Sequence, residues 1–372
     1  MRIGFDAKRA FNNRRGLGNY SRETIRILTS LAPENQYFLF TPGIDYDIKY
    51  DYPKNADIVS SNKNGKLLQA LWRTFGTKRE AEAMHLDIYH GLSHELPFGI
   101  EKTSIHTVLT MHDLLFIKHP ELFPAFDRTM YRKKYLHSCK IANHIIAVSK
   151  QTKQDLLALV PIDENKVDVV YQGCRTEFKT KVSKEQKNVL KQKYNLPDQF
   201  LLNVAAIEPR KNQMLILKAL ANGRIDMPLV IAGQKTDYQR EIVSFIEHHG
   251  LHNQVKLLPD LPAEELPTLY QSAMLFVFPS LYEGFGIPVV EALTSGLPVI
   301  AATGSCLEES GGPDSIYVSP HDEFELAEHI QQLLNNDTKR DIMIKRGYGY
   351  AERFSDAIIC QQLTSIYNKL IP

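Results

Sequence analysis

Short apolar runs alternate with longer amphipathic segments along nearly the whole chain. Runs rich in Val, Ile, Leu and Phe are typical of strands buried on both faces of a parallel sheet, and the segments between them have helical spacing. Regular alternation of strands and helices predicts an α/β fold with parallel sheets. The strands are expected in two series, at 2–5, 36–40, 57–59, 88–90, 107–111 and 144–148, and then at 199–205, 229–232, 255–258, 275–278, 298–301 and 315–318.

The two series predict two doubly wound, Rossmann-like domains. A chain of 372 residues is long enough for two domains with separate cores. A polar, lysine-rich stretch at about 176–198 lies between the series and is expected to contain the linker and an exposed helix, so the predicted domains are 1–178 and 195–351. The last segment, 352–372, is predicted to be an amphipathic helix because these apolar residues have helical spacing: Phe354, Ile358, Ile359, Leu363, Ile366 and Tyr367.

Cysteine spacing and the length of the apolar runs bear on the compartment. The four cysteines are far apart and are expected to be free thiols in a reducing environment: Cys139, Cys174, Cys306 and Cys360. The chain opens on a predicted strand rather than a signal peptide, and no apolar run approaches the roughly 20 residues that span a bilayer. We therefore expect a cytoplasmic protein.

Positive charge is concentrated in the first half of the chain. Residues 1–180 contain 26 Lys and Arg against 20 Asp and Glu, a net charge of +6, whereas residues 181–372 carry −5. Within 63–79, basic residues interleave with an apolar stripe at helical spacing, and a second basic cluster lies at 128–134. Two interpretations stay open: a solvated helix face over the core, or contact with anionic lipid or a phosphate-bearing acceptor. Nucleic acid is not an expected partner, because no nucleic-acid-binding motif accompanies the charge.

The most specific chemical pattern is a pair of carboxylates, Glu283 and Glu291, on either side of a glycine turn. The residues between them include Gly284, Phe285 and Gly286, which follow a predicted buried strand and precede a predicted helix. Glycines let the backbone approach a ligand closely, and a helix N-terminus offers free N–H groups to a phosphate. Ligands of open α/β sheets bind at such strand ends. The pattern suits a sugar nucleotide, with carboxylates accepting hydrogen bonds from sugar and ribose hydroxyls.

In its full context, Pro279-Ser-Leu-Tyr-Glu283-Gly-Phe-Gly-Ile-Pro-Val-Val-Glu291-Ala, this motif resembles the retaining GT-B glycosyltransferases of family four. The resemblance implies two Rossmann-like domains that face each other across a cleft, with the last helix returning to the first domain. It also implies that Glu283 holds hydroxyls of the donor sugar and Glu291 the ribose.

A second candidate site follows the predicted strand 199–205, where Arg210 and Lys211 precede a predicted helix. A diphosphate that is not held by a metal needs fixed cations, and Arg and Lys supply them as a planar fork and a point charge. The resemblance assigns the donor diphosphate to both residues. Ala205 and Ala206 depart from the family, which often has Gly-Thr or Gly-Arg at these positions. An arginine from that position is therefore absent, and Arg210 is expected to make the main contact with the diphosphate.

Two further features lie in the first domain. Gly16 and Gly18 follow the opening strand and begin a helix, and the resemblance places them beside the donor phosphates and the acceptor. His112 and Asp113 end another predicted strand, where an imidazole could hydrogen-bond the transferred sugar and a carboxylate could orient it. A flexible turn for the glycines, and a satisfied histidine at a helix cap, remain the alternative interpretations.

The resemblance implies a hexosyltransferase that moves a sugar from a nucleoside diphosphate sugar, with GDP-mannose favoured, to a hydroxyl of a glycan or lipid-linked glycan, with retention of configuration. No Asp-x-Asp pair ends a predicted strand and no His or Cys cluster has ligand spacing, so neither a metal nor a resident cofactor is expected.

Other function classes stay open. A sugar-nucleotide epimerase or hydrolase could use the same fold, and a nonenzymatic sugar-nucleotide-binding protein is disfavoured by the joint presence of the carboxylates and cations. An NAD-dependent dehydrogenase is disfavoured because no acidic residue follows Gly18 at the expected spacing.

Overall fold

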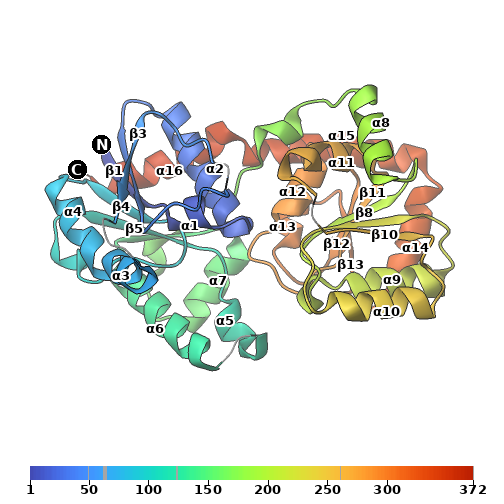
Figure 1. The fold of residues 1–372 in the computed structure, drawn as a ribbon, viewed down its shortest axis with the longest axis horizontal. Helices are drawn as coiled ribbons and strands as arrows, with labels where there is room; N and C mark the ends of the chain where they lie inside the picture. The colour runs from blue at the N-terminus through green and yellow to red at the C-terminus, as the bar shows by residue number, and fades with distance from the viewer. Residues whose placement is uncertain (49, 62–64, 123–124, 260, 372) are drawn as a thin grey trace. The chain divides into compact units, whose positions relative to one another are not determined.

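The computed structural model describes residues 1–48, 50–61, 65–122, 125–259 and 261–371 (Figure 1). They form two compact units. Unit 1 consists of Met1–Gly173 and Phe354–Pro372, and unit 2 of Cys174–Arg353.

Unit 1 contains a seven-stranded parallel sheet in the order β3-β2-β1-β4-β5-β6-β7. Its strands are β1 (Arg2–Asp6), β2 (Gln36–Thr41), β3 (Ala56–Ser60), β4 (Ile88–Gly91), β5 (His106–Met111), β6 (His144–Ala147) and β7 (Val167–Val169). Its α-helices are α1 (Lys8–Asn12), α2 (Gly16–Leu31), α3 (Lys66–Leu71), α4 (Thr77–Ala83), α5 (Leu115–Lys118), α6 (Ala125–Ile141), α7 (Lys150–Leu159) and α16 (Asp356–Leu370), and a π-helix, Trp72–Gly76, joins α3 to α4.

Unit 2 contains a six-stranded parallel sheet in the order β10-β9-β8-β11-β12-β13. Its strands are β8 (Leu201–Val204), β9 (Leu229–Ala232), β10 (Val255–Leu258), β11 (Leu275–Phe278), β12 (Val299–Ala302) and β13 (Ile316–Val318). Its α-helices are α8 (Lys184–Tyr194), α9 (Gln213–Gly223), α10 (Gln239–His248), α11 (Leu266–Ser272), α12 (Ile287–Thr294), α13 (Leu307–Gly311), α14 (Glu323–Leu334) and α15 (Asp337–Ala351).

Both sheets reverse their strand order once, between β1 and β4 in unit 1 and between β8 and β11 in unit 2. Because crossovers between parallel strands are right-handed, such a reversal places helices on both faces of a sheet. Two doubly wound α/β units are therefore confirmed. The reversals also mark where loops after the two central strands separate and leave room for a ligand.

All twelve predicted strands are present, each within two residues or so of its expected bounds. The thirteenth, β7, was not predicted because it has only three residues and Asp168 interrupts its apolar run. The stretch 176–198, expected to hold the linker, lies within unit 2. There the Ser183 capping box starts α8, and Val182 donates its backbone N–H to Gln271 of α11 at 2.9 Å.

The C-terminal helix α16 belongs to unit 1, where it packs on α2. Ile359, Leu363, Ile366 and Tyr367 are buried, whereas Ile358 is 37% exposed, so the predicted apolar stripe is correct except at Ile358. The Tyr367 hydroxyl lies 2.7 Å from Nδ1 of buried His90, at the centre of the sheet.

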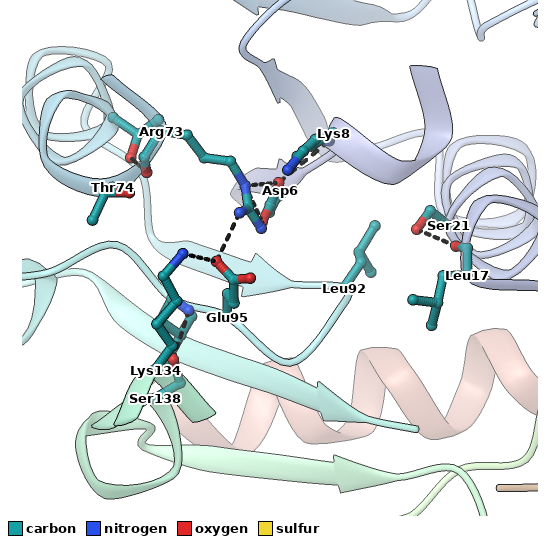
Figure 2. A network of polar contacts seen from close by, with 12 residues as sticks. Asp6, Lys8, Leu17, Ser21, Arg73, Thr74, Leu92, Glu95, Lys134 and Ser138 are labelled. Atoms are coloured by element: carbon teal, nitrogen blue, oxygen red, sulfur yellow. Dashed lines mark hydrogen bonds and ion pairs between the residues drawn. The ribbon is translucent and has the colours of Figure 1, made fainter. Parts of the chain in front are cut away.

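The basic amphipathic segment at 63–79 differs from its predicted form. Arg73 is buried, with a side chain only 10% exposed, and binds Asp6 and Glu95 (Figure 2). The predicted apolar stripe instead faces solvent at Leu67 and Leu71, which are 75% and 47% exposed. The interpretation of this segment as a solvated basic face over the core is therefore wrong. The side chains of Lys63, Lys66 and Arg128 lie outside the described residues.

Among the described residues, no helix is both long enough and apolar enough to cross a membrane.

Candidate functional site in two switch-point loops

Two loops meet at the strand reversal of unit 2, one after β8 and one after β11. The first ends in a 3-10 helix, Pro209–Lys211, followed by Asn212 with a left-handed φ of 56°. The Asn212 amide donates to Pro279 O at 3.1 Å and to Pro320 O at 2.8 Å, and Leu281 N donates to Arg210 O at 2.9 Å. These bonds fix the cation-bearing loop against the carboxylate-bearing loop.

Three predicted site residues, Arg210, Lys211 and Glu283, come together at this edge. Lys211 Nζ forms an ion pair with Glu283 Oε1, and Arg210 Nη1 lies 3.3 Å from Glu283 Oε2. Arg210 also donates to Tyr282 O at 2.7 Å and to Glu208 at 2.7 Å. These contacts hold the two cationic side chains side by side in fixed positions, which is the arrangement that recognition of a diphosphate requires.

Glu283 is ionised in this cluster. Burial by itself raises the pKa of a carboxyl group, but Lys211 and Arg210 outweigh it and hold the Glu283 pKa below its ordinary value. Ser280 adds a hydrogen bond of 2.7 Å to Oε1, and the Cys306 thiol donates to the Glu283 carbonyl at 3.1 Å. The Cys306 side chain therefore lies directly against the motif.

The glycine turn has a backbone that requires glycine at Gly286. Its φ is 106°, and a Cβ there would lie 2.7 Å from side-chain atoms of both Leu307 and Ser310. Gly286 directly precedes α12, as the sequence predicted. Gly284 and Phe285 form the bend before it, with Phe285 buried.

Glu291 occupies a different environment from Glu283. It lies on α12, is 9% exposed, and accepts a hydrogen bond of 3.0 Å from the Tyr270 hydroxyl of α11. Burial and the neighbouring Glu291 carboxylate both raise the pKa of Tyr270 well above its ordinary value, so Tyr270 stays a donor. The two carboxylates of the motif thus have separate partners, cations for Glu283 and a phenol for Glu291.

In unit 1, His112 follows β5 and is almost fully buried. Its Nε2 lies 2.9 Å from Leu92 O, its Nδ1 lies 3.4 Å from the Gln172 amide, and Tyr20 of α2 packs edge-on at 4.5 Å between ring centroids. Burial, with a smaller contribution from His94, lowers the pKa of His112 to about 3. A neutral ring of this kind can hydrogen-bond a substrate but carries no charge at neutral pH.

Asp113 and the two predicted glycines shape the loops around His112. Asp113 accepts a hydrogen bond of 3.0 Å from the backbone N–H of Leu115, the first residue of α5. Gly16 is the first residue of α2, and Gly18 lies two residues before Tyr20, whose ring packs on His112. The glycine helix start and the His112 loop are therefore neighbours within unit 1.

The two glycines allow a matched test. A Cβ at Gly18 would lie 1.9 Å from Asn13 O, whereas one at Gly16 would meet no atom within 4 Å. We expect Gly18→Ala to destabilise unit 1 by about 2 kcal/mol or more, and Gly16→Ala to change stability by less than about 0.5 kcal/mol. Urea unfolding followed by fluorescence of Trp72, the only tryptophan, measures both. Equal destabilisation by the two substitutions would contradict the packing described.

Sequence reasoning missed His94, the residue that fixes His112. The His112 backbone N–H donates to His94 Nε2 at 2.9 Å, and the two rings lie 5.1 Å apart. His94 follows β4 as His112 follows β5, so its position at a strand end was the available signal. Its left-handed φ of 66° could not be read from the sequence.

Comparison with known proteins identifies the family of the chain. Residues 185–350 match a family described as glycosyl transferases group 1, and residues 15–178 match one described as glycosyltransferase family 4. The chain is 30% identical over 95% of its length to O-antigen chain mannosyltransferase B of Escherichia coli, covering 96% of that protein. The chain belongs to this glycosyltransferase family.

Two further comparisons place the glycosyltransferase more closely. It is 25% identical over 91% of its length to O-antigen chain mannosyltransferase RfbU of Salmonella typhimurium, covering 92% of that protein. Its fold superposes on Anabaena HepE, solved in complex with UDP and glucose, with a TM-score of 0.77 over 99% of this chain and 100% of the other, at 19% identity. The predicted GT-B fold class is thereby confirmed for the glycosyltransferase.

Proposed function

We propose that this glycosyltransferase moves a mannosyl group from a nucleoside diphosphate mannose, GDP-mannose being the favoured donor, to a hydroxyl of a glycan or lipid-linked glycan in O-antigen or related polysaccharide synthesis. The names of the relatives at 30% and 25% identity support the sugar and the pathway. The observation that carries the proposal is the pair Arg210 and Lys211, both within ion-pair distance of the largely buried Glu283 at the strand reversal of unit 2.

The chemistry follows from where charge develops. As the acceptor hydroxyl oxygen bonds to the anomeric carbon, the bond from that carbon to the diphosphate oxygen breaks and negative charge grows on the departing phosphate. Arg210, Lys211 and the free N–H groups at the start of α12 stabilise that charge most in the transition state. The hydroxyl proton passes to the departing phosphate on the same face of the sugar, so the anomeric configuration is retained. Glu283 and Glu291 accept hydrogen bonds from donor hydroxyls.

We also propose that the transfer needs no metal ion, because Arg210 and Lys211 offer the diphosphate two charged hydrogen-bond donors at one site. A thermal-shift screen of the purified protein against UDP, GDP, ADP, dTDP and their common sugars, with and without EDTA, tests donor and metal together. We expect a selective rise in melting temperature with GDP and GDP-mannose that EDTA does not alter. Loss of the shift on chelation would contradict metal independence. A selective shift with a nucleotide other than GDP would show that the donor carries that nucleotide instead.

Analysis of products separates transfer from the other chemistries that the fold could support. Incubation of the donor with a glycan acceptor should release nucleoside diphosphate only when the acceptor is present. Release of free mannose without acceptor would indicate a hydrolase, and an altered sugar on an intact nucleotide would indicate an epimerase.

We further propose that unit 1 contacts the inner face of the plasma membrane. The exposed leucines of α3 and Phe75, which is 56% exposed, form an apolar face on a segment that, apart from the ion-paired Arg73, contains four basic and no acidic residues between 58 and 79. Apolar side chains on a basic segment favour an anionic bilayer surface.

The triple variant Leu67→Ser, Leu71→Ser, Phe75→Ser tests this contact. The fraction of this variant that sediments with vesicles containing phosphatidylglycerol should be at most half that of the parent protein. Each apolar side chain buried in the bilayer contributes roughly 1.5 to 3 kcal/mol to the free energy of binding. A triple variant in unit 2, Phe324→Ser, Ile342→Ser, Tyr348→Ser, removes exposed apolar residues elsewhere and serves as the control. Equal sedimentation of both variants and the parent protein would reject the membrane contact.

A further inference from the structure

The strand reversal of unit 1 brings together polar groups that the proposed donor site does not use. Lys8 and Arg9 begin α1 directly after β1, and Ser93 and His94 follow β4, the strand that pairs with β1. Ligands of doubly wound sheets bind where the loops after two such strands separate. These four residues therefore occupy the ligand-binding position of unit 1.

The carboxylates in this region are already paired. Arg73 contacts Asp6 Oδ2 through Nη2 at 2.5 Å and through Nε at 3.1 Å, and its Nη1 lies 2.7 Å from Glu95 (Figure 2). Lys134 lies 3.6 Å from the same Glu95 carboxylate. Two acids are thus matched by two bases before Lys8 and Arg9 are counted.

Lys8 and Arg9 add two positive charges that have no ion pair in this network, where Asp6 and Glu95 attract the Lys8 charge only from a distance. In the part of the chain that the structure describes, neither Lys8 Nζ nor the Arg9 guanidinium has a hydrogen bond or ion pair, and Arg9 Nε is fully buried. Burial first, and then repulsion from Arg73 and Arg9, lowers the pKa of Lys8. A buried cation without a counter-charge is costly unless an anion completes its environment.

His94 contributes a donor of known tautomer. Because its Nε2 accepts the His112 backbone N–H, the proton of the neutral ring must be on Nδ1. Burial, and then the nearby Arg9 charge, lowers the His94 pKa to about 3, so the ring is neutral. His94 Nδ1 and Ser93 Oγ are both buried and have no hydrogen-bond partner among the described residues.

The unsatisfied groups are almost all donors, and this decides the ligand chemistry. A sugar hydroxyl would both give and take hydrogen bonds, whereas Arg9, Lys8 and His94 Nδ1 can only give them. Phosphate oxygens only accept hydrogen bonds. They also carry negative charge, which Lys8 and Arg9 need as a counter-charge. The backbone of His94, held at a left-handed φ of 66°, is the kind of strained position found at ligand sites.

We propose that the β1 and β4 loops of unit 1 bind a phosphate group of the acceptor substrate, with Arg9, Lys8 and His94 Nδ1 as its hydrogen-bond donors. That the phosphate belongs to an acceptor rests on the proposed transfer function. That a phosphate binds here rests on the residues of unit 1 alone. It narrows the acceptor to a phosphorylated or diphosphate-linked glycan. The Arg73 network keeps Asp6 and Glu95 occupied, so that they do not compete with the phosphate for Lys8.

Nuclear magnetic resonance of the full chain labelled with ¹⁵N-histidine tests the site directly, because the His94 Nδ1–H signal reports on one residue. His94→Gln assigns the signal. Titration with inorganic phosphate should shift it in a saturable way, and Arg9→Gln and Lys8→Gln should each weaken binding roughly tenfold, the loss of one charged hydrogen bond. Lys140→Gln, at an exposed position of α6, should leave the affinity unchanged. An unresponsive signal, or equal affinity in all variants, would overturn the proposal.

A second titration distinguishes the two sources of phosphate. Saturating UDP or GDP should leave the His94 signal in place and phosphate binding intact if the phosphate belongs to the acceptor. Displacement of phosphate by the nucleotide would assign the group to the donor and overturn the proposal as stated. Phosphate binding without any sugar transfer would leave this site standing and remove the proposed function, whereas transfer with an unresponsive His94 would remove only this site.

Discussion

Replacement of Lys211 by alanine should lower kcat/KM for sugar transfer at least 100-fold. In the proposed mechanism Lys211 supplies one of two cations that face the departing diphosphate, and electrostatic groups of this kind contribute roughly two to three powers of ten to turnover. The same change leaves the largely buried Glu283 carboxylate with Arg210, at 3.3 Å, as its one remaining cation among the described residues, which should cost about 3 kcal/mol of stability. Steady-state kinetics and urea unfolding of the purified variant measure the two effects separately.

A double variant separates catalysis from stability. Lys211→Met combined with Glu283→Gln removes both charges, so no unpaired buried carboxylate remains, and stability should return to within about 1 kcal/mol of the parent. Turnover should stay at the low level of the single variant. Recovery of turnover together with stability would show that Lys211 acts only through the fold.

Acid should unfold unit 1 before unit 2. Burial lowers the pKa of His90, His94 and His112 to about 3, against an ordinary value of 6.5. Between these values the unfolded chain binds protons that the native state does not, so stability is constant above about pH 6.5 and falls as the pH drops toward 3. At pH 5 the three residues together should remove roughly 6 kcal/mol, a large part of the stability of an ordinary domain.

Pulsed hydrogen exchange with mass spectrometry at pH 7 and pH 5 measures this difference by region. Amides of β4 and β5 should lose protection from exchange at pH 5, while amides of β8 and β11 keep theirs. The reason is that no histidine is buried in the described part of unit 2. His90→Gln should reduce the pH dependence by about a third. Unchanged protection of β4 at pH 5 would contradict the low pKa values.

The fold was largely predictable because its parallel strands are buried on both faces and their apolar runs are nearly continuous. The grouping of Arg210, Lys211 and Glu283 was also predictable, since each follows a strand and neighbouring strand ends of a parallel sheet share an edge. These signals are local in the sequence, and the topology that connects them follows from right-handed crossovers.

Arg73 and His94 show where prediction ended. Helical spacing placed Arg73 on a solvated face, but its partners Asp6 and Glu95 are distant in sequence, and pairing with two carboxylates outweighs the cost of burial. The π-helix at Trp72–Gly76 also shifts the register of the side chains, so the stripe read at a period of 3.6 residues faces solvent. The role of His94 depends on its left-handed backbone and on the tautomer of its ring. Neither feature can be predicted from a pattern in the sequence.

The order of residues in unit 1 constrains how the chain folds during synthesis. Unit 2 is continuous, whereas unit 1 needs α16, which the ribosome makes only after the 180 residues of Cys174–Arg353. At 5–20 residues per second this delay is roughly 10 to 40 seconds. During that time His90 lacks its partner Tyr367, and the apolar surface that α16 covers is open to chaperones. The β1 and β4 loops of unit 1 therefore reach their final surroundings only after α16 is made, when unit 2 has had time to fold.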